Sequence, residues 1–377
     1  MKVYIKGGYQ TKFGELWDNS LEDLIFESFN NTLLETNTNI NQIEIIFIGN
    51  MLASQMYNQN HLNSLISELF NINIPIIRAE AACASGGMAI NQAFTAIKSG
   101  QFKNALVIGV EKMTDLSSDI ISDYLMSAAG PEERLSGVTF PGLYALITQK
   151  YFSDYKITSK ELSYISIKNH FHASLNEKSH FPFIINFDDY LKSPTVSSPL
   201  SLYDCSPISD GACSIILSVN KYNNSVELVS SQVATDSISL SKRKNICEFE
   251  STKIASKKAF EESGIDRKDI DLLEVHDCFT IAEILALEDL GFYKKGEGYI
   301  SSKLKQSYYY GKLPVNTSGG LKACGHPVGA SGVKQVYEIY NQLNGNCKKR
   351  QVKNAKVGLS QNIGGTGGTA VINILKK

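Results

Sequence analysis

The sequence predicts a layered α/β fold made of two related halves, and two observations support this prediction. Segments with helical spacing of apolar residues alternate with strand-length apolar runs, and the alternation occurs twice at nearly constant spacing. The runs are continuously apolar, which is typical of strands that helices cover on both faces of a sheet. We place the first half at residues 1–220 and the second at residues 221–377.

A helix followed by a strand begins the repeat in each half. Apolar residues recur at helical spacing over 21–29, and the strand-like run 42–48 follows them. The same order returns where the helical pattern of 254–260 leads into the apolar run 269–275. We therefore expect a helix, a short loop and a buried strand at corresponding places in the two halves.

A second matched pair follows in each half. Ala-Ser-Gly at 84–86 begins a helical pattern, and a strand-like run follows at 104–110. Ala-Ser-Gly at 330–332 begins another helical pattern, which leads to a run at 354–360. The offsets are 330 − 84 = 246 and 354 − 104 = 250, so two copies of one unit explain them better than chance does.

Residues 114–203 do not fit the repeat and form an insertion in the first half. The insertion carries three of the six histidines, a Pro/Gly-containing run and scattered lysines. Long insertions of this kind are usually lids or binding loops. We therefore expect a lid or a binding element there rather than an excursion of the chain without a role.

Composition limits the class of protein. Lys and Arg number 37 against 38 Asp and Glu, and this balance excludes a general nucleic-acid binder. The seven cysteines form no Cys-x-x-Cys pair, which indicates a reducing compartment rather than a disulfide framework. No secretory signal or bilayer-length apolar stretch is recognisable. We expect a cytoplasmic protein without a membrane span or a nucleic-acid partner.

Two loops that precede the repeated helices carry reactive side chains. Cys83 comes directly before one helix, where the helix dipole favours the thiolate and nucleophilic attack. His326 has the same place ahead of the second helix, so a pseudo-twofold axis between the halves would bring it to Cys83 as a proton acceptor. The alternatives are a buried structural cysteine and an incidental histidine in a glycine-rich turn.

Two more segments suit a ligand site. His276 and Asp277 end a strand of the second half, and strand ends are the usual location of sites in α/β sheets, although a satisfied histidine is the alternative. The glycine-rich run 361–369 lies between two strands, where backbone N–H groups suit an oxyanion. This run lacks Gly-Lys-Ser/Thr and opens no helix, so it is neither a phosphate loop nor a dinucleotide fingerprint.

These motifs together resemble those of thiolases. The resemblance covers essentially the whole chain, and it implies the thiolase fold, with two βαβαβαββ halves and a loop domain. It also implies assembly as a homodimer or homotetramer. The motifs are Cys-Ala-Ser-Gly-Gly at 83–87, His-Asp-Cys-Phe at 276–279, Gly-His-Pro at 325–327 and the glycine-rich C-terminal run, with support from Thr-Phe-Pro-Gly-Leu at 139–143 and the stretch 204–212.

Two departures from the motifs of better-known thiolases indicate the subtype. His-Asp-Cys-Phe stands where better-known thiolases have Asn-Glu-Ala-Phe, and Asn362-Ile363-Gly364 stands where they have Cys-x-Gly. The chain therefore resembles the sterol-carrier-protein-type and archaeal acetyl-CoA C-acyltransferases, in which the cysteine of the first motif is the acid/base. Cys324 lies beside His326, and spacing alone does not separate it from Cys278 in that role.

The resemblance implies a role for each matched residue. Cys83 is the acyl nucleophile and His326 its base, while Cys278 moves the substrate proton. His326 and a water held near His276 stabilise the enolate. The backbone N–H groups of Cys83 and Gly364 form the oxyanion site of the tetrahedral intermediate.

The implied activity is ping-pong Claisen chemistry that makes or cleaves a 3-ketoacyl-CoA of the acetoacetyl-CoA type. Acyl-CoA and CoA are substrates, and no cofactor or metal is expected. One alternative is a C-acyltransferase component that uses a non-CoA acceptor or passes its product to a synthase through a small bridging protein. Another is a non-catalytic thiolase-like lipid-binding protein. Lysines of the insertion and Lys242-Arg243-Lys244 are candidates for the CoA phosphates, whereas His170, His172 and His180 are expected to pack.

Overall fold

A single mixed sheet runs through the molecule. In the computed structural model, which describes residues 1–377, the strand order is β3-β2-β4-β7-β1-β8-β11-β10-β9. The first half supplies β1 (Tyr4–Gln10), β2 (Ile45–Gly49), β3 (Ile76–Ala79), β4 (Asn104–Glu111) and β7 (Gly211–Ser218). The second supplies β8 (Val226–Thr235), β9 (Leu272–Glu274), β10 (Val357–Gly364) and β11 (Thr369–Lys376).

The two half-sheets meet where β1 pairs with β8, with Tyr4 opposite Glu227 and Ile5 opposite Val226. Outward from this junction, the order is β1, β7, β4, β2, β3 in the first half and β8, β11, β10, β9 in the second, so β8, β11, β10 and β9 correspond to β1, β7, β4 and β2. In the second half the third strand is reduced to one parallel bridge between Leu273 and Val315, in the place that β3 takes beside β2. The predicted layered α/β fold with two related halves is confirmed.

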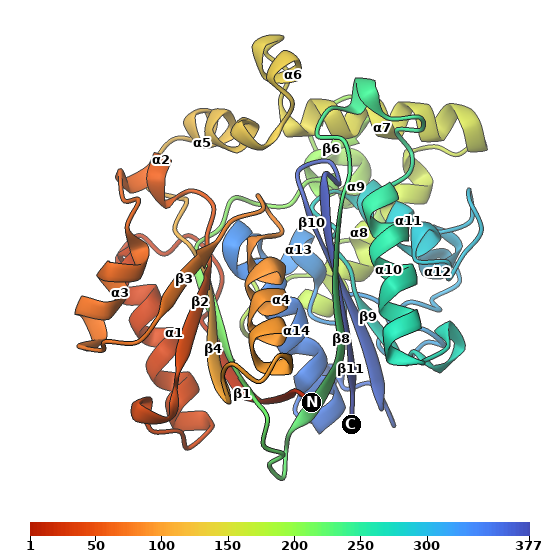
Figure 1. Ribbon diagram of the computed structural model, residues 1–377. Coiled ribbons are helices and arrows are strands. Elements are labelled where there is room, and N and C mark those ends of the chain that lie inside the picture. The colour runs from red at the N-terminus through yellow and green to blue at the C-terminus, as the bar shows by residue number, and fades with distance from the viewer.

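Helices cover both sides of each half-sheet. The helices α4 (Ser85–Lys98) and α14 (Val328–Asn344) lie together between the half-sheets and pack on each other (Figure 1). Their apolar side chains share one core with strands of both halves. The outer faces carry α1 (Leu21–Glu35) and α3 (Leu62–Phe70) on one side, and α10 (Glu250–Ser263) and α11 (Thr280–Asp289) on the other. The short helices are α2 (Ala53–Tyr57), α12 (Ile300–Lys303) and α13 (Gly320–Cys324).

Local sequence explains where these helices begin and end. Ser20 caps α1 in a capping box with Asp23, because each side chain accepts the backbone N–H of the other. Gly264 ends α10 and Gly345 ends α14, both in the left-handed conformation that glycine adopts without strain. The predicted strand of 42–48 begins later, at Ile45, because a short helical turn, Ile40–Gln42, precedes it.

The next-to-last strand, β10, lies further along the chain than the predicted run 354–360, since it begins at Val357 and ends at Gly364. β10 runs from Val357 to Gly364 because every one of its residues pairs with β11. The first half of the glycine-rich run is therefore strand, and only residues 365–368 form the turn. α14 begins at Val328, two residues before the predicted start.

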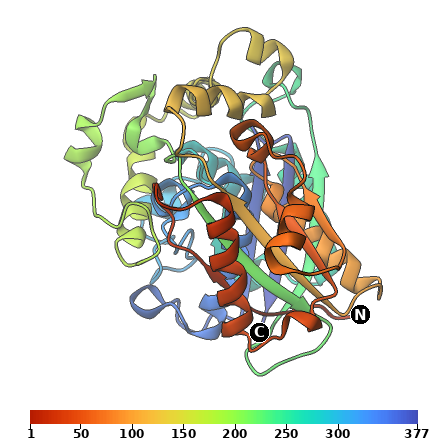
Figure 2. The same ribbon diagram turned by 90° about the vertical axis from the view of Figure 1, so that its left-hand side faces the viewer.

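The insertion forms a helical layer at one end of the sheet layers (Figures 1 and 2). It contains α5 (Ser118–Leu125), α6 (Pro131–Leu135), α7 (Phe140–Tyr155), α8 (Ser159–Ala173), α9 (Phe187–Lys192) and the short strands β5 (Thr195–Ser197) and β6 (Leu200–Ser201). Its core includes Cys278, Phe279 and Ile363 of the second half. The insertion therefore packs on the half of which it is not part. The helices of this chain lack the combination of length and hydrophobicity that a bilayer crossing takes.

Candidate active site

The loop before α4 holds Cys83 in a fixed position. Ala82 has a positive φ of 53°, which is strained for a residue with a Cβ. Three hydrogen bonds maintain it: the Ala82 N–H donates to Glu80 Oε1 at 2.6 Å, Ser85 Oγ donates to the Ala82 carbonyl at 2.6 Å, and the Ala81 N–H donates to Ser85 Oγ at 3.0 Å. This strain is typical of a reactive side chain that must point in one direction.

The Cys83 thiol keeps its proton at neutral pH. Burial raises its pKa to about 12, although backbone N–H groups of Gly365 and of Cys83 itself favour the thiolate. The nearby Glu111 carboxylate raises the pKa further. Burial thus opposes the helix dipole, which we expected to favour the Cys83 thiolate, and the resting thiol needs a proton acceptor.

Two histidines face Cys83. Its Sγ and one ring nitrogen each of His276 and His326 all lie within 4.8 Å of one another. The two imidazole rings are nearly perpendicular, with centroids 5.0 Å apart. The loops of the two halves thus meet as the pseudo-twofold argument expects. Sulfur and imidazole nitrogen are also ligands that zinc accepts, so these three side chains are the ones that could hold a metal ion.

Hydrogen bonds determine which nitrogen of His326 carries a proton. The Ser331 hydroxyl donates to the Pro327 carbonyl at 2.8 Å, so its oxygen accepts the Nδ1–H of His326 at 2.7 Å. This leaves a lone pair on Nε2. Burial and the charge of Lys334 lower the pKa of His326 to about 3. His326 is therefore a neutral proton acceptor.

His276 has the opposite tautomer because its partner is an amide. Asn362 Oδ1 accepts the Gly87 N–H at 3.1 Å, which turns the Asn362 amide nitrogen toward the Cys83 carbonyl and toward His276 Nδ1 at 3.0 Å. Nδ1 must accept this bond, so the proton lies on Nε2, which is buried without a partner in the protein. Burial, followed by the charge of His326, lowers the pKa of His276 well below its usual value. His276 therefore offers a free N–H donor to the site.

Cys278 lies in the link between β9 and α11. Its carbonyl accepts the Ser206 N–H at 2.9 Å, so the 204–212 stretch runs beside it. Burial raises the pKa of the Cys278 thiol well above its usual value, and the hydroxyl of Tyr144 partly opposes this. The carboxylate of Asp277 instead accepts the Leu321 N–H at 2.6 Å and the Asn169 amide at 2.7 Å, so it is a structural cap.

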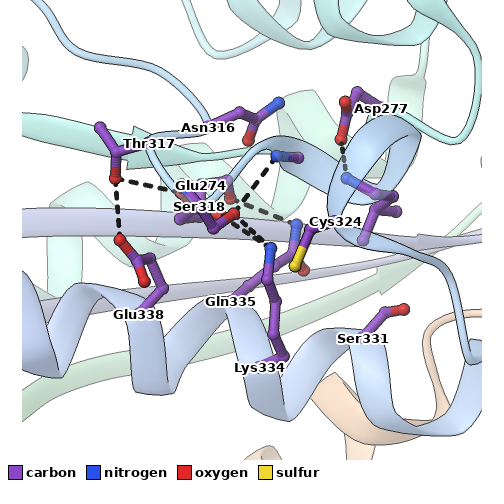
Figure 3. Close-up of polar contacts among 12 residues, drawn as sticks. Glu274, Asp277, Asn316, Thr317, Ser318, Cys324, Ser331, Lys334, Gln335 and Glu338 are labelled. Carbon is purple, nitrogen blue, oxygen red and sulfur yellow. Dashed lines mark hydrogen bonds and ion pairs between the residues drawn. The ribbon is translucent and has the colours of Figure 1, made fainter. Parts of the chain in front are cut away.

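A buried polar network that includes Lys334, Glu274 and Ser318 holds α14 in place (Figure 3). The Lys334 ammonium on α14 lies 3.3 Å from a Glu274 oxygen and also bonds Ser318 Oγ, which in turn donates to Glu274 at 2.7 Å. Figure 3 shows Ser331 one turn before Lys334 on the same helix. The helix that orients His326 through Ser331 is thus anchored by a buried ion pair.

Other candidate residues have structural partners. His172 bonds the Asn316 carbonyl at 2.9 Å and the Tyr309 N–H at 3.0 Å, His180 bonds Ser209 Oγ at 3.0 Å, and His170 lies 3.3 Å from the Phe183 carbonyl. Cys324 is fully buried and contacts the Asn176 amide at 3.7 Å.

Arg243 is hydrogen-bonded to the turn after β10. Arg243 bonds Thr366 Oγ1 at 3.1 Å and the Ser237 carbonyl at 2.8 Å. It is therefore a turn anchor, and of the predicted basic run only Lys242 and Lys244 remain exposed. A cleft of about 780 Å³ borders this region; its lining includes Ala81, Ala82 and Gly364 but none of the four predicted catalytic side chains.

Two functional neighbours were not singled out from the sequence. Asn362 lies in the segment that departs from Cys-x-Gly, and that departure was the available signal. Ser331 lies on the helix that follows His326, where one turn of helix brings its hydroxyl back to the ring. The structure also adds Gly365, whose N–H favours the thiolate of Cys83, next to the predicted Gly364.

The fold and the paired cysteine and histidine loops define a thiolase. The thiolase N-terminal domain profile matches residues 3–221, and the thiolase C-terminal domain-like profile matches residues 232–377. The chain belongs to the thiolase family, and the predicted family, fold and thiolase-type acyltransferase class are confirmed.

Similar proteins narrow the subgroup. Over all of its length the chain is 41% identical to an acetyl-CoA acetyltransferase of Methanothermobacter thermautotrophicus, of which it covers 99%. It is 43% identical to the acetyl-CoA acetyltransferase of Methanocaldococcus jannaschii, with 99% of this chain and 98% of that protein covered. Human sterol carrier protein 2 is 30% identical across the whole chain, which covers 72% of that protein. The structure titled Ltp2-ChsH2(DUF35) aldolase shares the fold, with a TM-score of 0.83 at 18% identity over 99% of this chain and 97% of that one.

Proposed function

We propose that this chain joins two acetyl-CoA molecules into acetoacetyl-CoA, or cleaves the product with CoA, through an acyl-Cys83 intermediate. The observation that carries the proposal is the opposite tautomer of the two histidines beside one half-buried thiol. One imidazole accepts a proton and the other donates one, which are the two demands of Claisen chemistry. The archaeal relatives named acetyl-CoA acetyltransferase favour the acetyl substrate.

In the first half-reaction, Cys83 gives its proton to Nε2 of His326 and attacks the thioester carbonyl. The N–H groups at Cys83 and at the 364–365 turn would hold the oxyanion. Collapse of the intermediate breaks the bond to the CoA sulfur, which leaves with the proton that His326 holds. The product is an acetyl thioester on Cys83.

In the second half-reaction, Cys278 first passes its thiol proton to Nε2 of His326, which is neutral again, and the resulting thiolate removes a proton from the methyl group of a second acetyl-CoA. A thiol with a raised pKa yields a strong base, and the α-carbon of a thioester is a weak acid that needs one. The N–H of His276 stabilises the enolate oxygen directly or through a water. The carbanion then attacks the acetyl-Cys83 carbonyl, and the bond between that carbon and the Cys83 sulfur breaks. The sulfur takes the proton that His326 holds, while Cys278 keeps the proton from the substrate, so both thiols are restored.

Mass spectrometry after incubation with acetyl-CoA tests the first half-reaction. We expect one acetyl adduct on Cys83, lost in Cys83→Ala and retained in Cys324→Ala. An adduct that survives Cys83→Ala would contradict the proposed nucleophile. The lipid-binding alternative predicts binding of acyl-CoA without any adduct.

Cys278→Ala tests the second half-reaction. This variant should keep the Cys83 adduct and lose condensation, by roughly 100-fold or more, the usual contribution of a positioned acid/base. Cys324→Ala is the matched control, since that thiol is equally buried. Equal loss of acylation and condensation in Cys278→Ala would show that Cys278 has another role.

We also propose that the chain forms a homodimer through β3. This strand pairs only with β2, and Ile77 on it is 46% exposed. Ile77→Lys should convert the dimer to a monomer in analytical ultracentrifugation, and an unchanged mass would place the interface elsewhere. A synthase or bridging partner stays a prediction, which co-purification from the native host would test.

A further inference from the structure

The loop domain contributes one buried hydroxyl to the centre of the site. Tyr144 lies on α7, directly after the Thr-Phe-Pro-Gly-Leu stretch with which that helix begins, and it has no exposed surface. Its ring stacks on Phe279, with centroids 4.4 Å apart and planes 24° apart. Figure 1 shows α7 across the end of the half-sheet where β10 ends. This places the Tyr144 hydroxyl between the Cys278 segment and the glycine-rich turn.

The hydroxyl has two acceptors for its single proton. In the resting site it donates to the Gly365 carbonyl at 3.1 Å, while Cys278 packs in the same buried cluster, where the nearby hydroxyl partly opposes the rise in the pKa of that thiol. The N–H of the same Gly365 favours the thiolate of Cys83. One phenol therefore connects Cys278 to the turn that contacts the nucleophile.

Resting on the proposed function, we propose that Tyr144 is a positioning residue for proton transfer by Cys278: its hydroxyl turns from the Gly365 carbonyl to the Cys278 sulfur when that sulfur becomes a thiolate. Tyr144 keeps its proton throughout. The proton that leaves the substrate carbon forms the new S–H bond of Cys278, and the hydroxyl then returns to the Gly365 carbonyl.

The surroundings leave this role to Tyr144. The charged or titratable groups that face Cys278 are Cys83 and Asp277, and both disfavour its thiolate. Arg243 is the cation that faces Tyr144, and it is held by Thr366 and Ser237. Among the side chains around Cys278, the hydroxyl of Tyr144 is the donor that favours the thiolate. Loss of the hydroxyl should therefore make the thiolate harder to form.

Tyr144→Phe tests this inference by separating the two half-reactions. We expect the Cys83 acetyl adduct to form at close to the wild-type rate. Deuterium exchange into the methyl group of acetyl-CoA in D₂O should slow about 10- to 150-fold, the range for a lost hydrogen bond to a charged group. The pH profile of exchange should move to higher pH. In the Cys278→Ala background the same change should have no further effect.

Tyr151→Phe is the matched control, because Tyr151 is equally buried on the same helix but bonds Glu288. Site-specific fluorotyrosine at 144 is a second variant that preserves the shape and strengthens the donor, so it should move the profile to lower pH. Exchange at the wild-type rate in Tyr144→Phe, or equal loss of acylation and exchange with an unmoved pH profile, would overturn the inference. A wild-type protein that never acylates Cys83 would instead overturn the proposed function.

Discussion

At the scale of single residues, the hydrogen-bond partner of each imidazole decides its chemistry. A hydroxyl that has already donated its proton can only accept, and Ser331 therefore leaves Nε2 of His326 as an acceptor. An amide nitrogen can only donate, and Asn362 therefore leaves Nε2 of His276 as a donor. Because both rings are neutral at pH 7, the site holds its mobile proton on Cys83.

Asn362→Asp should reverse the tautomer of His276. The new carboxylate accepts from Nδ1, so Nε2 loses its proton and can no longer donate to the enolate. We expect condensation to fall about 100-fold or more, as when one oxyanion donor is removed. ¹⁵N chemical shifts of His276 would report the tautomer.

Asn373→Asp is the matched control, since Asn373 is a buried amide on β11 that bonds Ser360 instead. If Asn362→Asp shows the reversed tautomer but condenses at the wild-type rate, His276 is not the enolate donor.

Lys322 predicts a pH dependence of stability. It is buried on α13, and burial lowers its pKa from 10.5 to about 8. The folded state therefore binds fewer protons than the unfolded state between these values, so this group adds stability as pH rises from about 8 to about 10.5. Lys322→Met should remove that rise and stabilise the protein at pH 7 by about 1–3 kcal/mol.

Urea unfolding at pH 7 and pH 9.5 measures both effects, with Lys257→Met as a surface control because Lys257 is 77% exposed. A Lys322→Met variant that is less stable than the parent at pH 7 would show that the ammonium has a favourable partner.

At the scale of elements, glycines let the starts of α4 and α14 approach each other. A Cβ on Gly86 would lie 2.6 Å from the Gly329 carbonyl oxygen. A Cβ on Gly332 would lie 2.3 Å from both the Gly87 nitrogen and Asn362 Oδ1. This approach brings the loops that precede the two helices together, and with them Cys83 and His326.

Gly332→Ala should therefore damage both packing and the site. The added methyl group has to push apart backbone and the amide that orients His276, and overpacking of this kind costs about 1–3 kcal/mol. We expect a lower melting temperature and a loss of condensation that exceeds the loss of folded protein. Gly368→Ala is the control, because its nearest atom would be 3.7 Å away; equal behaviour of the two variants would contradict this account.

The elements were more predictable than their contacts. Periodicity located α4 and α14, and the strand–loop junctions located Cys83 and His326, because these signals are local. The end of β10 was not predicted, because it depends on pairing with β11. The raised pKa of Cys83 was not predicted either, because it depends on burial by distant segments. Asn362 and His276 are 86 positions apart, and nothing in either local pattern indicates their pairing.

At the scale of the whole molecule, the two halves complete each other. Glu111 at the end of β4 accepts the Gly329 N–H of α14 at 3.0 Å, together with N–H groups of Met51 and Leu52. The apolar core around α4 and α14 contains side chains of both halves. The insertion of the first half covers Cys278 of the second. The site therefore exists only when both halves are folded.

We expect one cooperative unfolding transition for the whole chain. The fragment 1–220 should show no cooperative transition by calorimetry or circular dichroism, because α4 loses the partner against which it packs. Coexpression with fragment 221–377 should restore acylation of Cys83. A fragment 1–220 that unfolds cooperatively on its own would show that the halves are independent domains.

The reduced third strand of the second half limits how these molecules can associate. The N–H of Leu273 donates to the Pro314 carbonyl, and the Leu273 carbonyl accepts the Asn316 N–H, so the outer side of β9 is occupied. In the nine-stranded sheet, β3 is then the edge left with free backbone groups. Pairing of two such edges consumes both, and a third copy finds none. Edge-to-edge growth into filaments is therefore blocked at two molecules.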